Sequence, residues 1–137
     1  ASAFDVVEEA LGVIGRETNV SVIDLHAEAT SEKQALGWYV NGRASAMFGT
    51  HTHVQTADEK VLPGGTAYIT DAGMTGPVDS VIGIRKKDAI EKFLSGLPRR
   101  LEVDRTGRKE LQGVVVEIDY NNGRAVSIER LQEVEEQ

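Results

Sequence analysis

The chain has 137 residues, a formal net charge of −7 and no cysteine. This length suits one domain with one core. The lack of cysteine excludes disulfides, thiolate metal sites and thiol catalysis, so any bound metal must use nitrogen and oxygen ligands. No apolar run approaches the roughly 20 residues of a membrane span, and the acidic balance argues against non-specific wrapping of nucleic acid. We therefore expect a cytoplasmic protein with no membrane partner.

The first third of the chain alternates between helix and strand patterns. Apolar side chains recur at three- and four-residue steps before Gly15, which is typical of an amphipathic helix that ends at a glycine. Ser31 followed by Gln34 is a capping-box pattern, and the helix that it starts carries Trp38 and Tyr39, which we assign to the core. The first of two apolar strands suits burial on both faces. The expected elements are a helix over residues 4–14, a strand over 19–25, a helix over 31–40 and a strand over 44–48.

The remainder of the chain shows turns, one helix and antiparallel strands. Asn121-Asn122-Gly123 is a strong hairpin signal, because an Asn-Gly pair tolerates positive φ. The whole pattern indicates an α/β fold in which a mixed β-sheet is layered with helices. The expected elements are loops over residues 49–58 and 71–77, a strand over 66–70, a helix over 87–94, and strands over 111–120 and 124–131.

The three histidines lie at two places, each directly after a predicted strand. His26 follows the first strand, and His51 and His53 follow the second. Ligands bind beyond the carboxyl ends of parallel strands, so the three imidazoles would share one edge of the sheet if these strands are neighbours. In an extended segment, residues two apart project to the same side, which would place His51 beside His53. Gly49 would allow the chain to turn sharply out of the second strand, so that His51 and His53 face the edge of the sheet.

Neutral imidazole binds Zn, Fe, Mn, Ni or Co. Three interpretations stay open from these residues alone: a histidine pair without metal, a mononuclear zinc site of three histidines that activates water, or part of a larger metal site. A ligating ring usually donates its other N–H to a nearby oxygen. Candidates for that oxygen are Asp24, Glu28, Thr50, Thr52, Asp58 and Asp71.

Three stretches resemble the YmdB-like family of bacterial metallophosphoesterases: His26-Ala-Glu-Ala-Thr-Ser-Glu-Lys-Gln-Ala-Leu-Gly-Trp38, Gly49-Thr-His-Thr-His-Val-Gln-Thr-Ala-Asp58 and Leu62-Pro-Gly-Gly-Thr-Ala-Tyr-Ile-Thr-Asp-Ala-Gly-Met-Thr-Gly76. The likeness is dense over residues 20–83 and looser up to residue 131. It implies half of a metallophosphoesterase-type α/β/β/α sandwich and a pair of iron or manganese ions. It also implies hydrolysis of phosphodiesters such as 2′,3′-cyclic nucleotides by a water that two metals activate.

Carried over residue by residue, the resemblance makes His26 and His51 ligands of one metal and His53 a ligand of the other. The family's other ligands, and the histidine that protonates the leaving group, lie in its amino-terminal half and have no counterpart here. We therefore expect residues 1–137 to form a single domain that is the carboxyl-terminal portion of a larger one and is inactive alone. The expected partners are a small phosphodiester substrate, the missing amino-terminal half of the same protein and further copies in a homo-oligomer.

The loop after the 66–70 strand supplies candidate substrate contacts. Gly73, Thr75 and Gly76 would face a phosphate there, although turn geometry is the alternative explanation for the glycines. Two functions of other classes stay open. One is a non-catalytic binding or regulatory module with a degenerate half-site. The other is a relative of the capsule poly-glutamate synthesis proteins, for which amide-bond formation would replace phosphodiester hydrolysis.

Overall fold

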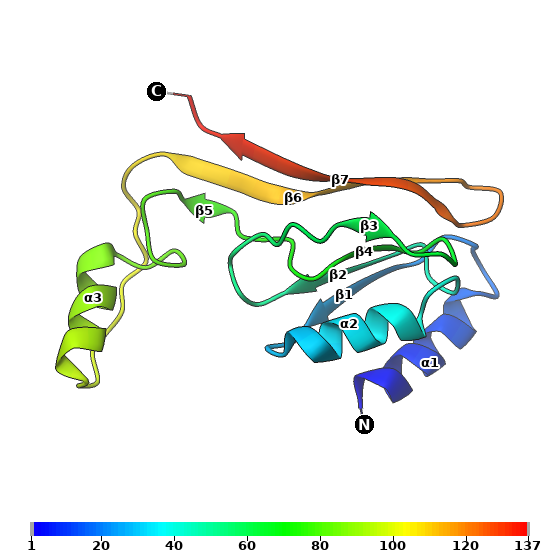
Figure 1. Cartoon of the computed structure of the whole chain (residues 1–137), viewed down its shortest axis with the longest axis horizontal. Coiled ribbons are helices and arrows are strands. Elements are labelled where there is room, and N and C mark those ends of the chain that lie inside the picture. The colour runs from blue at the N-terminus through cyan, green and yellow to red at the C-terminus, as the bar shows by residue number, and fades with distance from the viewer. Residues whose placement is uncertain (1, 137) are drawn as a thin grey trace.

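The computed structural model describes residues 2–136 and arranges them in three layers (Figure 1). Two helices cover one face of a four-stranded sheet, and a three-stranded sheet covers the other face. The expected α/β fold with a mixed sheet layered with helices is confirmed, and the helix, sheet and sheet correspond to three layers of the expected sandwich. The elements are α1 (Ala3–Ile14), β1 (Val22–His26), α2 (Thr30–Tyr39), β2 (Ala46–Thr50), β3 (Lys60–Val61), β4 (Ala67–Ile69), β5 (Gly76–Pro77), α3 (Lys86–Ser95), β6 (Lys109–Ile118) and β7 (Ala125–Val134).

The four-stranded sheet has the order β1-β2-β4-β3 and brings the histidine-bearing strand ends together. β1, β2 and β4 run parallel, and β3 is antiparallel to β4. The two strands that precede the histidines are therefore neighbours, and His26 lies opposite Thr50 in their register. β2 starts and ends two residues later than the sequence predicted, which places Gly49 inside the strand.

Two apolar clusters hold the layers together. The larger one lies between the helices and the four-stranded sheet, and Leu36, Met47 and Tyr68 are buried in it. The smaller one lies between the two sheets, where Ala46, Ala67 and Ala125 meet. Side chains of this size let the two sheets approach closely, and the β6–β7 ribbon lies over β2 and β4 as a result.

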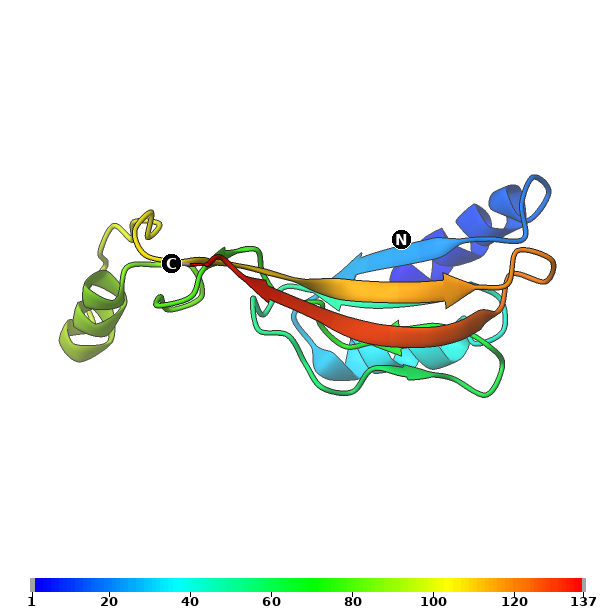
Figure 2. The same cartoon turned by 90° about the horizontal axis from the view of Figure 1, so that it is seen from above.

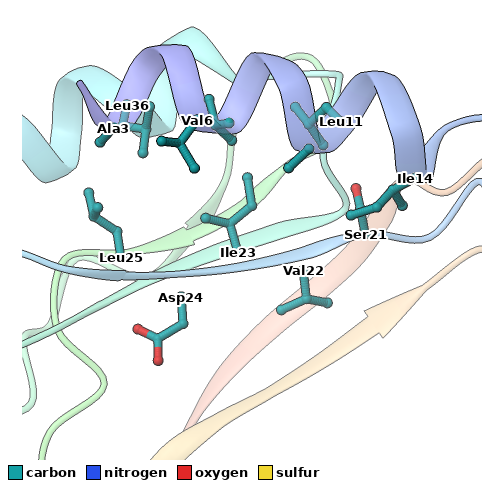
Figure 3. Close-up of a pocket in the computed structure, with 12 residues that line it drawn as sticks. Ala3, Val6, Leu11, Ile14, Ser21, Val22, Ile23, Asp24, Leu25 and Leu36 are labelled. Atoms are coloured by element: carbon teal, nitrogen blue, oxygen red, sulfur yellow. The ribbon is translucent and has the colours of Figure 1, made fainter. Parts of the chain in front are cut away.

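β1 is exposed on one face, so the expectation that it is buried on both faces is wrong. Val22 is 56% exposed, and Asp24 and His26 are exposed on the same face of the strand. Ile23 and Leu25 point the opposite way, toward α1, across an open apolar groove of about 410 Å³ (Figure 3). The exposure follows from the topology, because β1 is the outermost strand and the cluster between the sheets lies over β2 and β4.

The predicted helix is present as α2, but it begins at Thr30, so Ser31 lies in its first turn and is not the cap that the Ser31–Gln34 pattern predicted. The residue before the helix is Ala29, which makes no side-chain cap. Trp38 is 55% exposed and Tyr39 is also exposed, so neither belongs to the core. The buried face of α2 follows helical spacing through residues 33, 36 and 37 instead.

The carboxyl-terminal elements match their predictions more closely. β6 and β7 form the expected antiparallel hairpin, and Gly123 has a φ of 71° in its turn. α3 is the predicted helix, and it lies at one end of the molecule, away from both sheets (Figures 1 and 2). Within residues 2–136, no helix combines the length and apolarity that crossing a membrane requires.

Candidate metal centre

The ends of β1 and β2 place two of the three histidines in contact. Nδ1 of His51 lies 3.3 Å from Nε2 of His26, and the two rings meet edge to face with centroids 5.1 Å apart. Strand pairing accounts for this contact, since His26 sits beside Thr50 and His51 is the next residue. Both rings are exposed to solvent at the edge of the sheet.

A chain of hydrogen bonds orients the His26 ring. The hydroxyl of Thr50 donates to Oδ1 of Asp24 at 3.0 Å and lies 3.1 Å from Nδ1 of His26. A hydroxyl has one proton, so Thr50 must accept from His26 when it donates to Asp24. Nδ1 of His26 then carries the ring proton, and Nε2 presents a lone pair to His51. A carboxylate that acts through a second group on the far nitrogen is a common support for a metal-binding histidine.

The spacing of the two facing nitrogens fits a shared cation. Nitrogens bound to one ion with the bond lengths of zinc, about 2.0–2.1 Å, and a near-tetrahedral angle lie roughly 3.3–3.4 Å apart. The separation between His26 and His51 is 3.3 Å. This pair can therefore hold either a proton or a metal ion between its rings.

His53 is held separately from this pair. Its Nδ1 donates to the carbonyl oxygen of Ile82 at 2.8 Å, which leaves Nε2 as a free lone pair. Both residues have left-handed backbones, with φ values of 62° for His53 and 49° for Ile82, and His51 also has a positive φ of 151°. Such conformations are costly for residues other than glycine and concentrate at functional sites.

The structure brings His26 and His51 together and points His53 at a different partner. Residues 51–53 are not extended, so the argument that His51 and His53 project to the same side as in a strand is wrong. No group of three or more histidine, aspartate or glutamate side chains is placed to hold a metal ion within residues 2–136. A mononuclear site of three histidines gains no support from this geometry. The assignment of all three residues as metal ligands stays a prediction.

A buried ion pair lies beneath the loop of residues 51–59, here called the histidine loop, and holds it in place. Nζ of Lys33 lies 3.0 Å from Oδ2 of Asp71, and both side chains are 0% exposed. The same oxygen accepts the backbone N–H of Thr52 at 2.9 Å, and Oδ1 accepts that of Gly73 at 3.0 Å. Burial raises the pKa of Asp71, but these N–H groups and the ammonium together outweigh it, so the pKa lies below its usual value. The Asp71 carboxylate therefore anchors both the histidine loop and the loop of residues 71–75 that contains Gly73.

Asp58 ties the end of the histidine loop to β4. Its carboxylate accepts the hydroxyl of Thr56 at 2.6 Å and the backbone N–H of Thr70 at 3.1 Å. Burial raises the pKa of Asp58, but hydrogen bonds from the Thr56 and Thr70 hydroxyls and from backbone N–H groups together outweigh it, so the pKa lies below its usual value. The loop is thus anchored near both of its ends.

Gly49 is required by close packing rather than by a turn. It lies within β2, and a Cβ there would fall 1.9 Å from the carbonyl oxygen of Thr70 and 2.7 Å from Cδ of Lys33. The predicted role in a sharp exit from the strand is therefore wrong. The missing side chain lets Lys33 pass beneath β2 and reach Asp71.

The two glycines of the candidate substrate loop have structural roles that do not require a substrate. Gly73 has a φ of 89°, and a Cβ there would lie 2.2 Å from Oε1 of Gln112. Gly76 pairs with β6 as part of β5, and Thr75 is exposed. Contact between Gly73, Thr75 or Gly76 and a substrate stays a prediction.

Sequence reasoning missed two residues of this region. Lys33 could have been found, because it shares the spacing of the buried residues of α2. The Ile82 carbonyl could not, since a backbone acceptor 29 residues from His53 leaves no trace in the side-chain pattern. The proposed ring-orienting oxygens included Asp24 and Thr50, which the structure places beside His26.

Comparison with known proteins finds relatives that are named as phosphodiesterases. The sequence model of the family described as "YmdB-like protein" matches residues 1–131. A 2′,3′-cyclic-nucleotide 2′-phosphodiesterase of Bacillus subtilis is 53% identical over 128 residues, which cover 93% of this chain and 48% of that protein. A putative phosphatase/phosphodiesterase of Mycoplasma pneumoniae is 40% identical, over 97% of this chain and 47% of its own length.

Solved structures show the same fold. A novel phosphatase from Mycoplasma pneumoniae matches with a TM-score of 0.89 and 38% identity, over 98% of this chain and 47% of that one. A hypothetical protein from Thermus thermophilus matches with a TM-score of 0.88 and 37% identity, over 98% of this chain and 52% of that one. The chain thus spans about half the length of the curated relatives and solved structures that it matches.

Proposed function

Because this chain belongs to the YmdB-like protein family, we propose that it supplies part of the active site of a metal-dependent phosphodiesterase. The substrates would be small phosphodiesters such as 2′,3′-cyclic nucleotides, by analogy with the activity named for the Bacillus subtilis relative. The observation that carries the proposal is the His26–His51 pair, whose facing nitrogens are separated as two ligands of one ion would be.

The residues around the three histidines have distinct roles in the proposed site. Asp24 and Thr50 hold His26 with Nε2 free, and the Ile82 carbonyl does the same for His53. Lys33 and Asp71 fix the loop that carries His51 and His53. We assign His26 and His51 to one metal and His53 to a second, both iron or manganese. The two ions would polarise the phosphate and activate the attacking water.

Protonation of the leaving group requires a residue from elsewhere. The sequence holds three histidines, and all three are assigned as ligands. We assign the general acid and the remaining ligands to the part of the relatives that lies outside the matched half. Two ligands for one ion and one for the other are too few for tight binding, so the 137-residue chain alone would show little activity.

The test is hydrolysis of bis-p-nitrophenyl phosphate by the complete gene product in the presence of Mn²⁺. Loss of one ligand in His51→Ala should lower turnover by about 100-fold or more, because even the supporting groups of a metal site are worth about 10–100-fold. Tyr120→Ala, in the distant hairpin turn, is the control and should retain full activity. Unchanged turnover in His51→Ala would refute the assignment.

A further inference from the structure

A tight turn presents the carbonyl group that holds the His53 ring. Val81 and Ile84 exchange two backbone hydrogen bonds of 2.9 Å each, so that Ile82 and Gly83 form the loop between them. The φ values of Ile82 and Gly83 are 49° and 91°, and positive values at both central residues are typical of a type I′ turn. Such turns favour asparagine or glycine at the first central position. An isoleucine there is therefore a departure from the usual turn sequence.

Ile82 has a backbone conformation that its own side chain disfavours. A left-handed backbone is uncommon for residues other than glycine, and for a β-branched residue it is an outlier. Strained residues of this kind persist where the surrounding structure determines their conformation, and they concentrate at functional sites. Within residues 2–136 the N–H of Ile82 donates to no acceptor, whereas its carbonyl accepts Nδ1 of His53 at 2.8 Å. The hydrogen bond to His53 is therefore the one that this conformation serves.

The turn closes the base of a projecting segment. This segment comprises residues 84–103, contains α3, and lies at one end of the molecule beyond both sheets (Figures 1 and 2). At its base Ile84 forms a bridge with Val103. The N–H of Asp104 then donates to the carbonyl oxygen of Gly83 at 2.8 Å. The returning chain therefore holds the turn on one side.

The turn is also held from the side of the ribbon. The hydroxyl of Ser80 donates to the carbonyl oxygen of Pro77 at 2.8 Å and accepts the N–H of Gly83 at 2.9 Å. Pro77 belongs to β5, which pairs with β6. Hydrogen bonds on both sides of the turn thus offset the cost of the left-handed backbone at Ile82.

The His53 ring depends on this turn for its orientation. The side chain is exposed, and the Ile82 carbonyl is the one hydrogen-bond partner of its ring among residues 2–136. In a neutral histidine, the hydrogen bond made by one ring nitrogen sets which nitrogen carries the proton. A metal binds the nitrogen that lacks the proton. The carbonyl therefore decides that Nε2 of His53 is the nitrogen available to a ligand.

We propose that Ile82 is a positioning residue of the candidate metal centre. The base of the 84–103 segment holds its backbone left-handed, and its carbonyl thereby keeps the proton of the neutral His53 ring on Nδ1. The segment thus acts on the site through its attachment to the turn and not through its exposed side chains. The role of His53 as a metal ligand rests on the proposed function, whereas the hold of Ile82 on the ring does not.

Three substitutions of Ile82 test its backbone separately from its side chain. Proline fixes φ at about −65° and cannot form this turn, whereas asparagine and glycine adopt positive φ. Nitrogen NMR of the metal-free complete gene product, above about pH 8 where imidazoles are neutral, reports which ring nitrogen carries the proton. Ile82→Asn and Ile82→Gly should keep the His53 proton on Nδ1, and Ile82→Pro should not. His26, which Thr50 and Asp24 orient, is the internal control and should stay unchanged in every variant.

A second pair of variants tests the base of the segment. Asp104→Pro removes the N–H that binds the Gly83 carbonyl, and Asp104→Ala is the matched control because it removes the side chain alone. Asp104→Pro should place the His53 proton on both ring nitrogens in exchange, and Asp104→Ala should keep it on Nδ1. Equal spectra for the two variants would overturn the role of the base. This pair decides the question if Ile82→Pro disturbs His26 as well.

Binding of Mn²⁺ separates this inference from the proposed function. Ile82→Pro should weaken Mn²⁺ binding by about 10–100-fold, the usual effect of losing the partner that orients a ligand, and Ile82→Asn should bind like the wild type. A His53 proton that stays on Nδ1 in Ile82→Pro, or that leaves it in Ile82→Gly, would overturn the role of the Ile82 backbone. A displaced proton with unchanged Mn²⁺ binding would instead contradict the assignment of His53 as a metal ligand.

Discussion

Ion pairs occur in two contrasting regions of this protein, beneath the histidine loop and in the arm, which is the segment of residues 84–103 that contains α3. Lys33 and Asp71 are both 0% exposed, whereas Arg99 in the arm is 42% exposed. When a buried partner is removed, a charge remains in a medium that cannot solvate it. When an exposed partner is removed, water takes its place. An ion pair between basic and acidic side chains therefore holds the histidine loop in place in one region and contributes little to stability in the other.

The largest expected effect is at the buried pair. Lys33→Met should lower the free energy of unfolding by about 3–5 kcal/mol, because it leaves Asp71 buried without its cation. Urea unfolding measures the change. Lys87→Met is the matched control, since Lys87 is 79% exposed and pairs with Glu91 at 4.0 Å. Its effect should stay within about 0.5 kcal/mol. Equal unfolding midpoints for the two variants would remove the contrast between the regions.

An intermediate effect is expected from a pair of glycines, one in each region. Gly73 and Gly96 both have positive φ, so alanine at either position should cost about 1–2 kcal/mol of backbone strain. At Gly73 the new Cβ would also meet Gln112 at 2.2 Å, whereas at Gly96 it would meet nothing within 4 Å. Overpacking should add about 1–3 kcal/mol at Gly73 only. Thermal unfolding of Gly73→Ala and Gly96→Ala measures the difference, and equal losses would contradict it.

The smallest effect is expected at the exposed ion pairs of the arm. Arg99→Ala removes the contacts to Asp88 and Glu91 and should change the free energy of unfolding by no more than about 1 kcal/mol. Urea unfolding under the same conditions gives the comparison with Lys33→Met. A loss above about 2 kcal/mol would mean that the arm is more tightly integrated with the body than its contacts show.

Much of the fold follows from local sequence signals. The amphipathic spacing before Gly15 and the Asn121–Gly123 turn each act over a few residues, and both elements form as predicted. The exposed face of β1 could not be predicted in this way. Its composition suits a buried strand, but burial depends on where the β6–β7 ribbon comes to rest, and that ribbon lies about 90 residues later in the chain.

The candidate site likewise has features that local sequence predicts and features that depend on residues far away in the chain. The contact between His26 and His51 could be predicted, because each follows an apolar strand and parallel strands align their carboxyl ends. The position of His53 could not, since it depends on a left-handed backbone and on the Ile82 carbonyl. Lys33 has the spacing of the buried residues of α2 and could have been found, but its charge argues against burial unless the partner is known, and Asp71 is 38 residues away.

The outermost position of β1 has a consequence for how the site would be completed. Among the described residues no strand pairs with the outer edge of β1, so its N–H and C=O groups could accept a further strand, by the strand-addition mechanism that extends β-sheets. An added strand would run about 4.8 Å from β1, so side chains at its end would reach the His26 ring. Sheet extension and the arrival of new functional groups would then be a single structural event.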